Sequence, residues 1–132
     1  MPQGKKKIMI VDQDAFLSYI LAVRFRRAGF NALSADSLDE AWGQLADFRP
    51  DVVIAAVDLG QDNGFDMLER VRQWEAESGR RAKVVLLDRL ANPAKYNRSR
   101  AKGADGYIAK TSASFEDMLV IVREVLQGER AF

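Results

Sequence analysis

Short runs of apolar residues alternate with longer amphipathic segments along this chain. Four of the runs are brief, partly β-branched and nearly continuous, which is typical of strands buried on both faces. These runs cover 8–11, 52–57, 84–87 and 107–109, and a weaker fifth candidate covers 31–34. The pattern therefore predicts five strands.

Five helical patterns lie between and after these runs. Ser37 and Glu40 have the spacing of a capping box, and Asn92 stands before a proline at the first position of a helix. Glycines end four of the patterns. The first expected helix has an apolar stripe at Leu17, Ile20, Leu21, Phe25 and Ala28, and the second begins after Ser37 and ends before Pro50. The other three expected helices cover 65–79, 92–103 and 114–128.

Strands and helices that alternate over 132 residues predict a single α/β domain. Its architecture is a doubly wound parallel sheet with right-handed crossovers. We expect the domain to cover 6–128, with flexible ends at 1–5 and 129–132.

Composition removes several kinds of chemistry. The chain has no cysteine and no histidine, which excludes disulfides, thiolate metal sites and histidine acid–base catalysis. Twenty basic residues stand against nineteen acidic ones, so no global field favours nucleic acid or an anionic membrane. The apolar run behind the basic start is too short for a signal peptide or a membrane helix. We therefore expect a cytoplasmic protein.

Charged residues follow four of the predicted strands. In doubly wound sheets, ligands bind outside the carboxyl ends of the strands, where these residues would meet. The alternative is that strands simply stop at polar residues. The residues in question are Asp12 after the first strand, Asp58 after the third, Asp88 after the fourth and Lys110 after the fifth.

Several spaced landmarks agree with one known family. They are Ile10-Val11-Asp12, Arg49-Pro50-Asp51, Asn63-Gly64-Phe65, 102–107 and Ala109-Lys110. On these residues the chain resembles the receiver domain of bacterial response regulators. The resemblance implies a flavodoxin-like (βα)5 fold with strand order 2-1-3-4-5. It also implies a role in two-component signalling and phosphorelay rather than an enzyme activity of its own.

The resemblance also shows where this sequence departs from a working receiver. Such a domain carries an acidic pair after its first strand and a phosphoryl-accepting Asp after its third. Two of these carboxylates, with a backbone carbonyl, hold Mg²⁺. Here Asp12 matches the first acid, Gln13 stands in place of the second, and Ala56 falls at the acceptor position. Asp58 falls where the family presents the carbonyl. We therefore expect no cofactor and no tight Mg²⁺ site.

Three further positions were compared with the family pattern, and one of them departs from it. Asp88 falls where the family has Ser or Thr, while Lys110 and the switch aromatic Tyr107 are kept. A lysine near this crevice needs a partner once the acceptor carboxylate is gone. The hypothesis is that Asp88 or Asp12 pairs with Lys110 and fixes the pocket in one state. The alternative is that Asp88 and Lys110 both face solvent.

These departures predict a pseudo-receiver, a phosphorylation-independent interaction module of bacterial signalling. The segment from Ala56 also resembles the pseudo-receiver of a myxobacterial gliding-motility protein, which suggests cell polarity or motility. One alternative is a Mg²⁺-dependent phospho-receiver that uses Asp58 as its acceptor. A third hypothesis, a flavin or nucleotide site, is disfavoured by the acidic loop 12–14, which would repel phosphate.

The predicted partner surface is the face made by the fourth helix, fifth strand and fifth helix. Basic residues there would suit an acidic protein, although a solvated basic face is the alternative. The wide apolar coverage of the fifth helix indicates either burial against both sheet and fourth helix or a homodimer contact. The residues assigned to this surface are Lys95, Tyr96, Arg98, Lys102, Met118 and Val122.

Overall fold

The computed structural model describes residues 4–132 and contains one central parallel sheet. Its strands lie in the order β2-β1-β3-β6-β7. Since β6 and β7 are the fourth and fifth predicted strands, the expected order 2-1-3-4-5 and the doubly wound fold are confirmed. The strands are β1 (Lys7–Val11), β2 (Asn31–Ala35), β3 (Val52–Ala56), β6 (Lys83–Asp88) and β7 (Gly106–Ala109).

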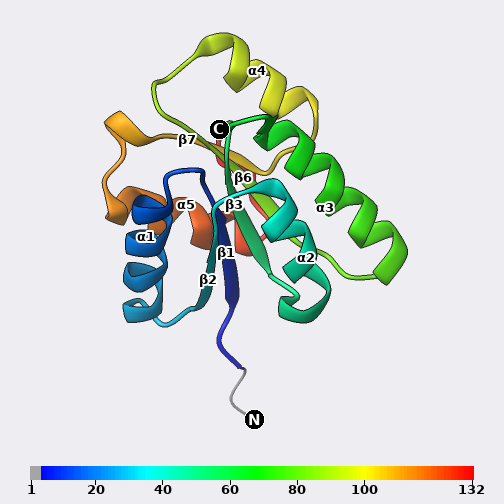
Figure 1. Ribbon diagram of the computed structural model, residues 1–132. Coiled ribbons are helices and arrows are strands. Elements are labelled where there is room, and N and C mark those ends of the chain that lie inside the picture. Colours follow the sequence, from blue (N-terminus) through cyan, green and yellow to red (C-terminus); the bar gives the residue numbers. More distant parts are fainter. Residues whose placement is uncertain (1–3) are drawn as a thin grey trace.

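Helices cover both faces of the sheet (Figure 1). Helices α1 (Ala15–Arg27) and α5 (Phe115–Leu126) pack on one face, where Phe25 and Val122 are fully buried. Helices α2 (Leu38–Phe48) and α3 (Gly64–Ser78) pack on the other, and α4 (Pro93–Ala101) lies beside them. A 3₁₀ turn, η1 (Lys110–Ser112), follows β7.

Among the described residues, no helix is both long enough and apolar enough to cross a membrane.

The helix starts follow the predicted capping residues. Ser37 Oγ accepts a hydrogen bond from the Glu40 amide at 3.1 Å, and Asn92 Oδ1 accepts one from the Lys95 amide at 3.0 Å. These side chains satisfy amides that have no partner inside the helix. Ser114 caps α5 in the same way. Helix α4 ends at Ala101, two residues before the predicted end.

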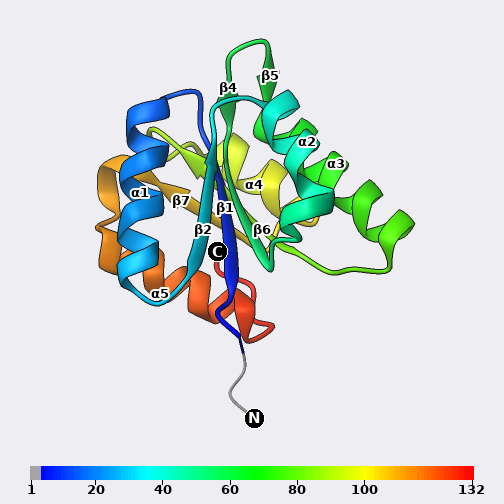
Figure 2. The ribbon, with the colours of Figure 1, turned by 60° about the horizontal axis from the view of Figure 1, so that its bottom comes forward.

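A small antiparallel hairpin was not predicted. Strands β4 (Asp58–Leu59) and β5 (Asp62–Asn63) extend beyond the end of β3 (Figure 2). Gly60 turns the chain between them with φ at +77°, a conformation that favours glycine. Two-residue strands carry no detectable period, so the hydrophobic pattern could not reveal them.

The C-terminal end differs from the flexible end that we expected. The Ala131 amide donates to the Asp105 carbonyl at 2.8 Å, and the Tyr107 amide donates to the Ala131 carbonyl at 3.3 Å. Phe132 packs edge-on against Tyr96, with ring centroids 5.4 Å apart. The segment 129–132 therefore lies against the outer edge of β7. Of the expected N-terminal flexible end, residues 1–3 lie outside the described part, and residues 4–5 are exposed.

Candidate functional site at the carboxyl ends of the strands

The carboxyl ends of β1, β3 and β6 and the turn after β7 enclose a cleft of about 420 Å³. Every strand of the sheet is parallel, so residues that follow different strands meet at this edge. All six residues assigned to the pocket from the sequence line the cleft. They are Asp12, Gln13, Ala56, Asp58, Asp88 and Lys110.

Lys110 is paired with Asp12 across the floor of the cleft. The ammonium Nζ of Lys110 donates to Oδ2 of Asp12 at 2.6 Å. The Asp12 side chain is 2% exposed, and its other oxygen, Oδ1, accepts the amide of Asp14 at 3.0 Å. Of the two partners proposed for Lys110, the structure therefore selects Asp12.

Asp88 instead holds the aromatic residue Tyr107. The phenol of Tyr107 donates to Oδ2 of Asp88 at 2.6 Å, and both side chains are buried. Oδ1 of Asp88 accepts the amide of Arg89 at 3.0 Å and lies 3.8 Å from Nζ of Lys95. The carboxylate is thus fully engaged inside the protein, so Asp88 does not face solvent.

The phenol of Tyr107 is held in its protonated form. Burial raises its pKa to about 12, and the hydrogen bond to the Asp88 carboxylate acts in the same direction. The amide of Asn92, which donates to the phenol oxygen at 3.2 Å, opposes this shift by stabilising the phenolate. At neutral pH the O–H of Tyr107 is therefore always available as a donor to Asp88.

Ala56, which the sequence analysis matched to the acceptor position, is a buried residue with only a methyl side chain. Ala56 is the last residue of β3 and is 2% exposed. Gly64, the first residue of α3, packs so closely that an added Cβ would lie 2.6 Å from the Ala56 carbonyl oxygen. This contact explains why glycine follows Asn63, and it fixes the end of β3 against α3.

Gln13 and Asp58 line the outer part of the cleft. Both residues are exposed. Oδ1 of Asp58 accepts the amide of Gly60 at 3.1 Å, which is the hydrogen bond of the tight turn in the hairpin. Asp58 therefore belongs to the hairpin beyond β3 rather than to the floor of the cleft.

Two of the six residues assigned to the partner surface are buried. Met118 and Val122 are 6% and 0% exposed, because the apolar arc of α5 packs against the sheet. Their assignment to a partner surface was wrong, whereas Val120 of the same helix is 53% exposed.

The other residues assigned to the partner surface lie on α4 or directly after it, are exposed or half-buried, and contact the rest of the fold. The guanidinium of Arg98 lies 4.2 Å from the ring centre of Phe65, and Nζ of Lys102 lies 3.8 Å from Glu69. Tyr96 stands between two other aromatic rings, those of Tyr107 and Phe132.

The sequence analysis did not assign every residue that lines the cleft to the pocket. Lys95 was assigned to the partner face but lines the cleft beside Asp88, and Asn92 contributes its amide to Tyr107. Asn92 ends the connection between β6 and α4, and Lys95 lies in the first turn of α4. Since that connection must cross the carboxyl edge of the sheet, its residues were candidates for the site by topology alone.

The fold and this cleft define a class of protein: a flavodoxin-like α/β domain whose acids and lysine meet at the carboxyl edge of the sheet. A comparison with family models gives the family, because the response regulator receiver domain matches residues 8–123. The chain belongs to this family of two-component signalling domains.

Among curated proteins, RcaC of Microchaete diplosiphon is 28% identical over 134 residues, covering 99% of this chain and 20% of RcaC. The DNA-binding response regulator MtrA of Mycobacterium tuberculosis H37Rv is 29% identical over 110 residues, covering 83% of this chain and 46% of MtrA. The chain thus spans less than half the length of either relative.

Solved structures share the fold. A LuxR-family two-component response regulator from Aurantimonas sp. SI85-9A1 superimposes with a TM-score of 0.84 at 23% identity, covering 98% of this chain and 90% of that one. A CheY-like receiver domain protein from Methanospirillum hungatei JF-1 gives 0.82 at 21% identity, covering 95% and 96%. At these identities the likeness concerns the fold.

Proposed function

We propose that this receiver domain is a phosphorylation-independent protein-interaction module. The observation that carries the proposal is that the pocket residues are already paired with one another. Lys110 contacts Asp12 at 2.6 Å, and Tyr107 donates to Asp88 at 2.6 Å. Each group that would respond to a phosphoryl group in a working receiver therefore has a partner within the chain.

Loss of phosphoryl transfer follows from the chemistry of Ala56. A methyl group cannot form an acyl phosphate, and this methyl is buried at the end of β3. The charge that Lys110 would offer to a phosphoryl oxygen is compensated by Asp12. Both the acceptor and the free cation of phosphoryl transfer are thus missing from the floor of the cleft.

We propose further that the cleft does not bind Mg²⁺ tightly. This ion requires oxygen ligands in a near-octahedral arrangement. Around Asp12 the cleft offers the neutral amide of Gln13 and the exposed carboxylate of Asp58, and a second cation would have to compete with Lys110 for Asp12. Each close unit charge replaced by a neutral group removes roughly 8 kcal/mol of attraction for a divalent ion at an effective dielectric near 20, before desolvation is subtracted.

Asp88 supplies the reason for a constant conformation. Its carboxylate brings a permanent negative charge to the position of a neutral Ser or Thr, and it keeps Tyr107 buried through the phenol. A domain fixed in this way presents the same surface to partners at all times. The proposal includes a role in bacterial cell polarity or motility, and the only support for that role is the sequence resemblance of the segment from Ala56.

The alternative function, a phospho-receiver that uses Asp58, has one observation in its favour. Asp58 is exposed and lines the same cleft as Lys110. Against it stand the hydrogen bond from the Gly60 amide to Asp58 and the position of Asp58 on the hairpin, beyond the end of β3.

Amide NMR spectra with Mg²⁺, and then with Mg²⁺ and beryllofluoride, test the proposal. We expect no saturable shift at Asp12, Ala56, Asp88 or Lys110. Saturable shifts that disappear in Asp58→Asn would establish the alternative. Asp62→Asn, which changes another acid of the hairpin, is the matched control, in which any shift that depends on Asp58 should persist.

A gain-of-function variant checks that the assay can detect a working pocket. Gln13→Asp, Ala56→Asp and Asp88→Thr together restore the acids and the hydroxyl of the family pattern. We expect this triple variant to respond to beryllofluoride while the natural domain does not. A response of both, or a response of the natural domain alone, would refute the proposed loss of function.

A further inference from the structure

The amino edge of the sheet, opposite the cleft, carries a row of basic residues. Three parallel strands that are neighbours in the sheet, β1, β3 and β6, begin at this edge. The row consists of Lys7 at the start of β1, Arg49 before β3, Arg81 before β6 and Lys83 at the start of β6. We call these four residues the basic strip. None of them forms a salt bridge within residues 4–132.

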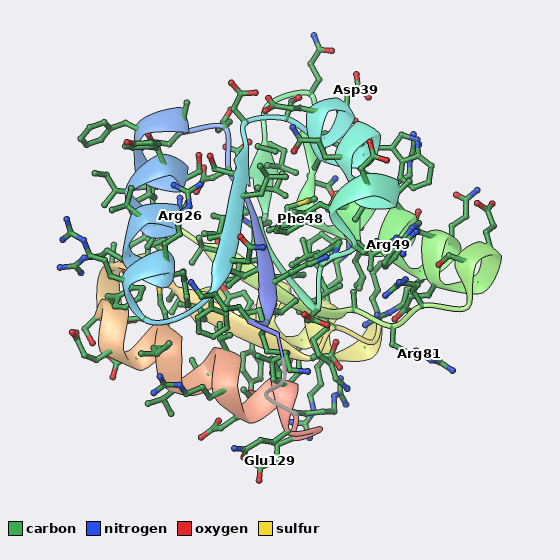
Figure 3. The ribbon with its side chains drawn as sticks, turned by 90° about the horizontal axis from the view of Figure 1, so that it is seen from below. Arg26, Asp39, Phe48, Arg49, Arg81 and Glu129 are labelled. Carbon is green, nitrogen blue, oxygen red and sulfur yellow. The ribbon has the colours of Figure 1, made fainter. Side chains whose placement is uncertain are left out.

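Backbone hydrogen bonds join the strand starts that carry the basic strip. The Asp51 amide donates to the Lys7 carbonyl at 2.8 Å, and the Lys83 amide donates to the Asp51 carbonyl at 2.9 Å. Figure 3 shows Arg49 and Arg81 on the same side of the molecule, the side of α2 and α3. Neighbouring strands lie about 4.8 Å apart, so three adjacent strand starts span about 10 Å. The cations are therefore grouped rather than scattered.

The acids at this edge are committed to other groups. Three carboxylates each accept a backbone amide at 2.8 Å, and they belong to Asp51, Glu75 and Asp105. Those of Glu75 and Asp105 also share the guanidinium of Arg72. The exposed acids Asp47 and Glu77 lie on α2 and α3 and form no salt bridge with the strip in the described chain. The positive charge of the strip is thus left without a close internal partner.

Arg49 has a backbone conformation that does not suit arginine. It ends α2 with φ at +55°, and in the part of the chain that the structure describes it is the one residue other than glycine with a positive φ. Glycine or asparagine is the usual residue at such a helix end. The side chain is exposed, and its hydrogen bond to the Ala46 carbonyl is long, 3.4 Å. Since the fold gains little from this side chain, the strain indicates a use for its charge outside the fold.

An open cavity of about 470 Å³ adjoins the strip. It is lined by Arg72, Glu75, Arg81, Ala82, Lys83 and Asp105. Both acids of this set already bind Arg72, so the cations that face the cavity without a salt bridge in the described chain are Arg81 and Lys83. Arginine binds a carboxylate through two parallel N–H bonds, and the cavity has room for a carboxylate side chain.

The surroundings of the strip favour one kind of anionic partner. A nucleic acid brings a continuous row of phosphates, which the exposed acids Asp47 and Glu77 beside the strip would repel. A membrane contact needs apolar side chains that insert, whereas the exposed large apolar side chains of the described residues lie on α1, α5 and the connection after β6. An extended peptide rises about 3.3 Å per residue, so three or four residues cross the strip and can place each carboxylate separately.

We infer that the basic strip binds an acidic, extended segment of a partner protein, whose Glu or Asp side chains meet Arg49 and enter the cavity at Arg81. The inference rests on the proposed function and deepens it by naming a surface and the chemistry of the partner. Because the strip lies at the edge opposite the cleft, this contact does not involve the pocket residues.

A displayed peptide library tests the inference. Its members are about ten residues long, enough to extend past the strip at both ends, and carry Glu, Gln or Lys at alternate positions among Ser and Gly. The library is sorted with the fluorescently labelled domain, and the affinity of the best synthetic peptide is measured by fluorescence anisotropy. We expect enrichment of Glu over Gln and Lys. We also expect the affinity to fall about tenfold for the Arg49→Gly, Arg81→Gln double variant.

The single variant Arg49→Gly separates binding from a structural role. Glycine adopts the left-handed conformation without steric cost, so the melting temperature should stay the same or rise while the affinity falls about threefold, as for loss of one exposed ion pair. A side chain with a structural role alone predicts the reverse, a lower melting temperature and an unchanged affinity. Arg81→Gln should also weaken binding about threefold. Arg89→Gln removes the same charge from an exposed position at the opposite edge and should leave the affinity unchanged.

Several outcomes would overturn the inference. These are no enriched Glu peptide, equal enrichment of Glu and Gln, or binding that survives the double variant. Three further results assign the strip to another occupant: tighter binding of an oligothymidylate of equal charge, flotation with vesicles of phosphatidylcholine and phosphatidylglycerol, or self-association in sedimentation, if the double variant abolishes the effect.

The beryllofluoride response reports on the opposite edge of the sheet. A response of the pocket together with peptide binding at the strip would refute the proposed function alone. A silent pocket together with an inert strip would refute this inference alone.

Discussion

Replacing Lys110 by Met removes the ammonium group but keeps an apolar stem of similar length. It leaves the Asp12 carboxylate, which is 2% exposed, without the cation 2.6 Å away. Removal of one partner from a buried ion pair costs about 3–5 kcal/mol. The Lys110 side chain is 23% exposed at an open cleft, and Asp12 keeps the amide of Asp14. We therefore expect a loss at or just below the lower limit of this range, about 2–3 kcal/mol in the free energy of unfolding.

A double-mutant cycle isolates the interaction itself. Asp12→Asn leaves Lys110 able to reach water and should cost about 1–2 kcal/mol, less than Lys110→Met. The double variant removes both charges, so its loss should be smaller than the sum of the single losses by about 1–2 kcal/mol. Urea unfolding, followed by the fluorescence of Trp42 and the buried Trp74, measures all four proteins.

The comparison has a clear refuting result. If Lys110→Met stays within about 0.5 kcal/mol of the natural protein, the contact with Asp12 does not stabilise the fold. If the two single losses add, the residues act independently and the pocket is not held by their pairing.

Two further perturbations test other contacts of the pocket. Tyr107→Phe leaves Oδ2 of Asp88 without its donor and should lower the free energy of unfolding by about 1–3 kcal/mol at neutral pH. Because the folded-state pKa of Tyr107 is raised to about 12 from an ordinary 10, the contribution of the phenol is full below pH 10 and declines as the pH rises toward 12. The stability gap between the two proteins, measured by urea unfolding, should narrow in that window, and a constant gap would contradict the assignment. Gly64→Ala brings a Cβ within 2.6 Å of the Ala56 carbonyl and should cost about 1–3 kcal/mol. Gly43→Ala, in an open position of α2, should instead add about 0.5–1 kcal/mol, and equal melting temperatures for the two variants would refute the close contact.

The hydrophobic pattern was sufficient for the doubly wound α/β class, because the signals in this chain are local and unambiguous, whereas the strand order came from the family resemblance. The central strand β3 is five buried residues in a row, and strong polar or turn residues flank it. Helix starts at Ser37 and Asn92 depend on a side chain and an amide three residues away, which a sequence displays directly. The edge at which the pocket forms follows from the parallel arrangement.

The pairing inside the pocket could not be predicted in the same way. Asp88 is opposite Ala109 in the register of β6 and β7, so Asp88 stands nearer in register to Lys110 than Asp12 does. Lys110 nevertheless reaches to β1, because Asp88 is turned toward Tyr107. Such choices depend on rotamers and distances of a few ångströms, which no spacing of residues encodes.

Surface assignments failed for a related reason. The apolar residues of α5 cover more than one stripe, and the sequence could not say which of them face the sheet. Met118 and Val122 do, and Val120 does not. On α1, the sequence assigned Ile20 to the buried stripe, but its side chain is 37% exposed.

The pairing of Ala131 with Gly106 has a practical consequence for anyone who prepares this protein. A recombinant fragment that ends at Gly128, where the helical pattern ends, would lack residues 129–132. The outer edge of β7 would then be exposed, and Tyr96 would lose its contact with Phe132. Bare strand edges recruit other chains, so such a fragment invites edge-to-edge aggregation. The last four residues therefore decide whether a shortened protein stays dispersed in solution.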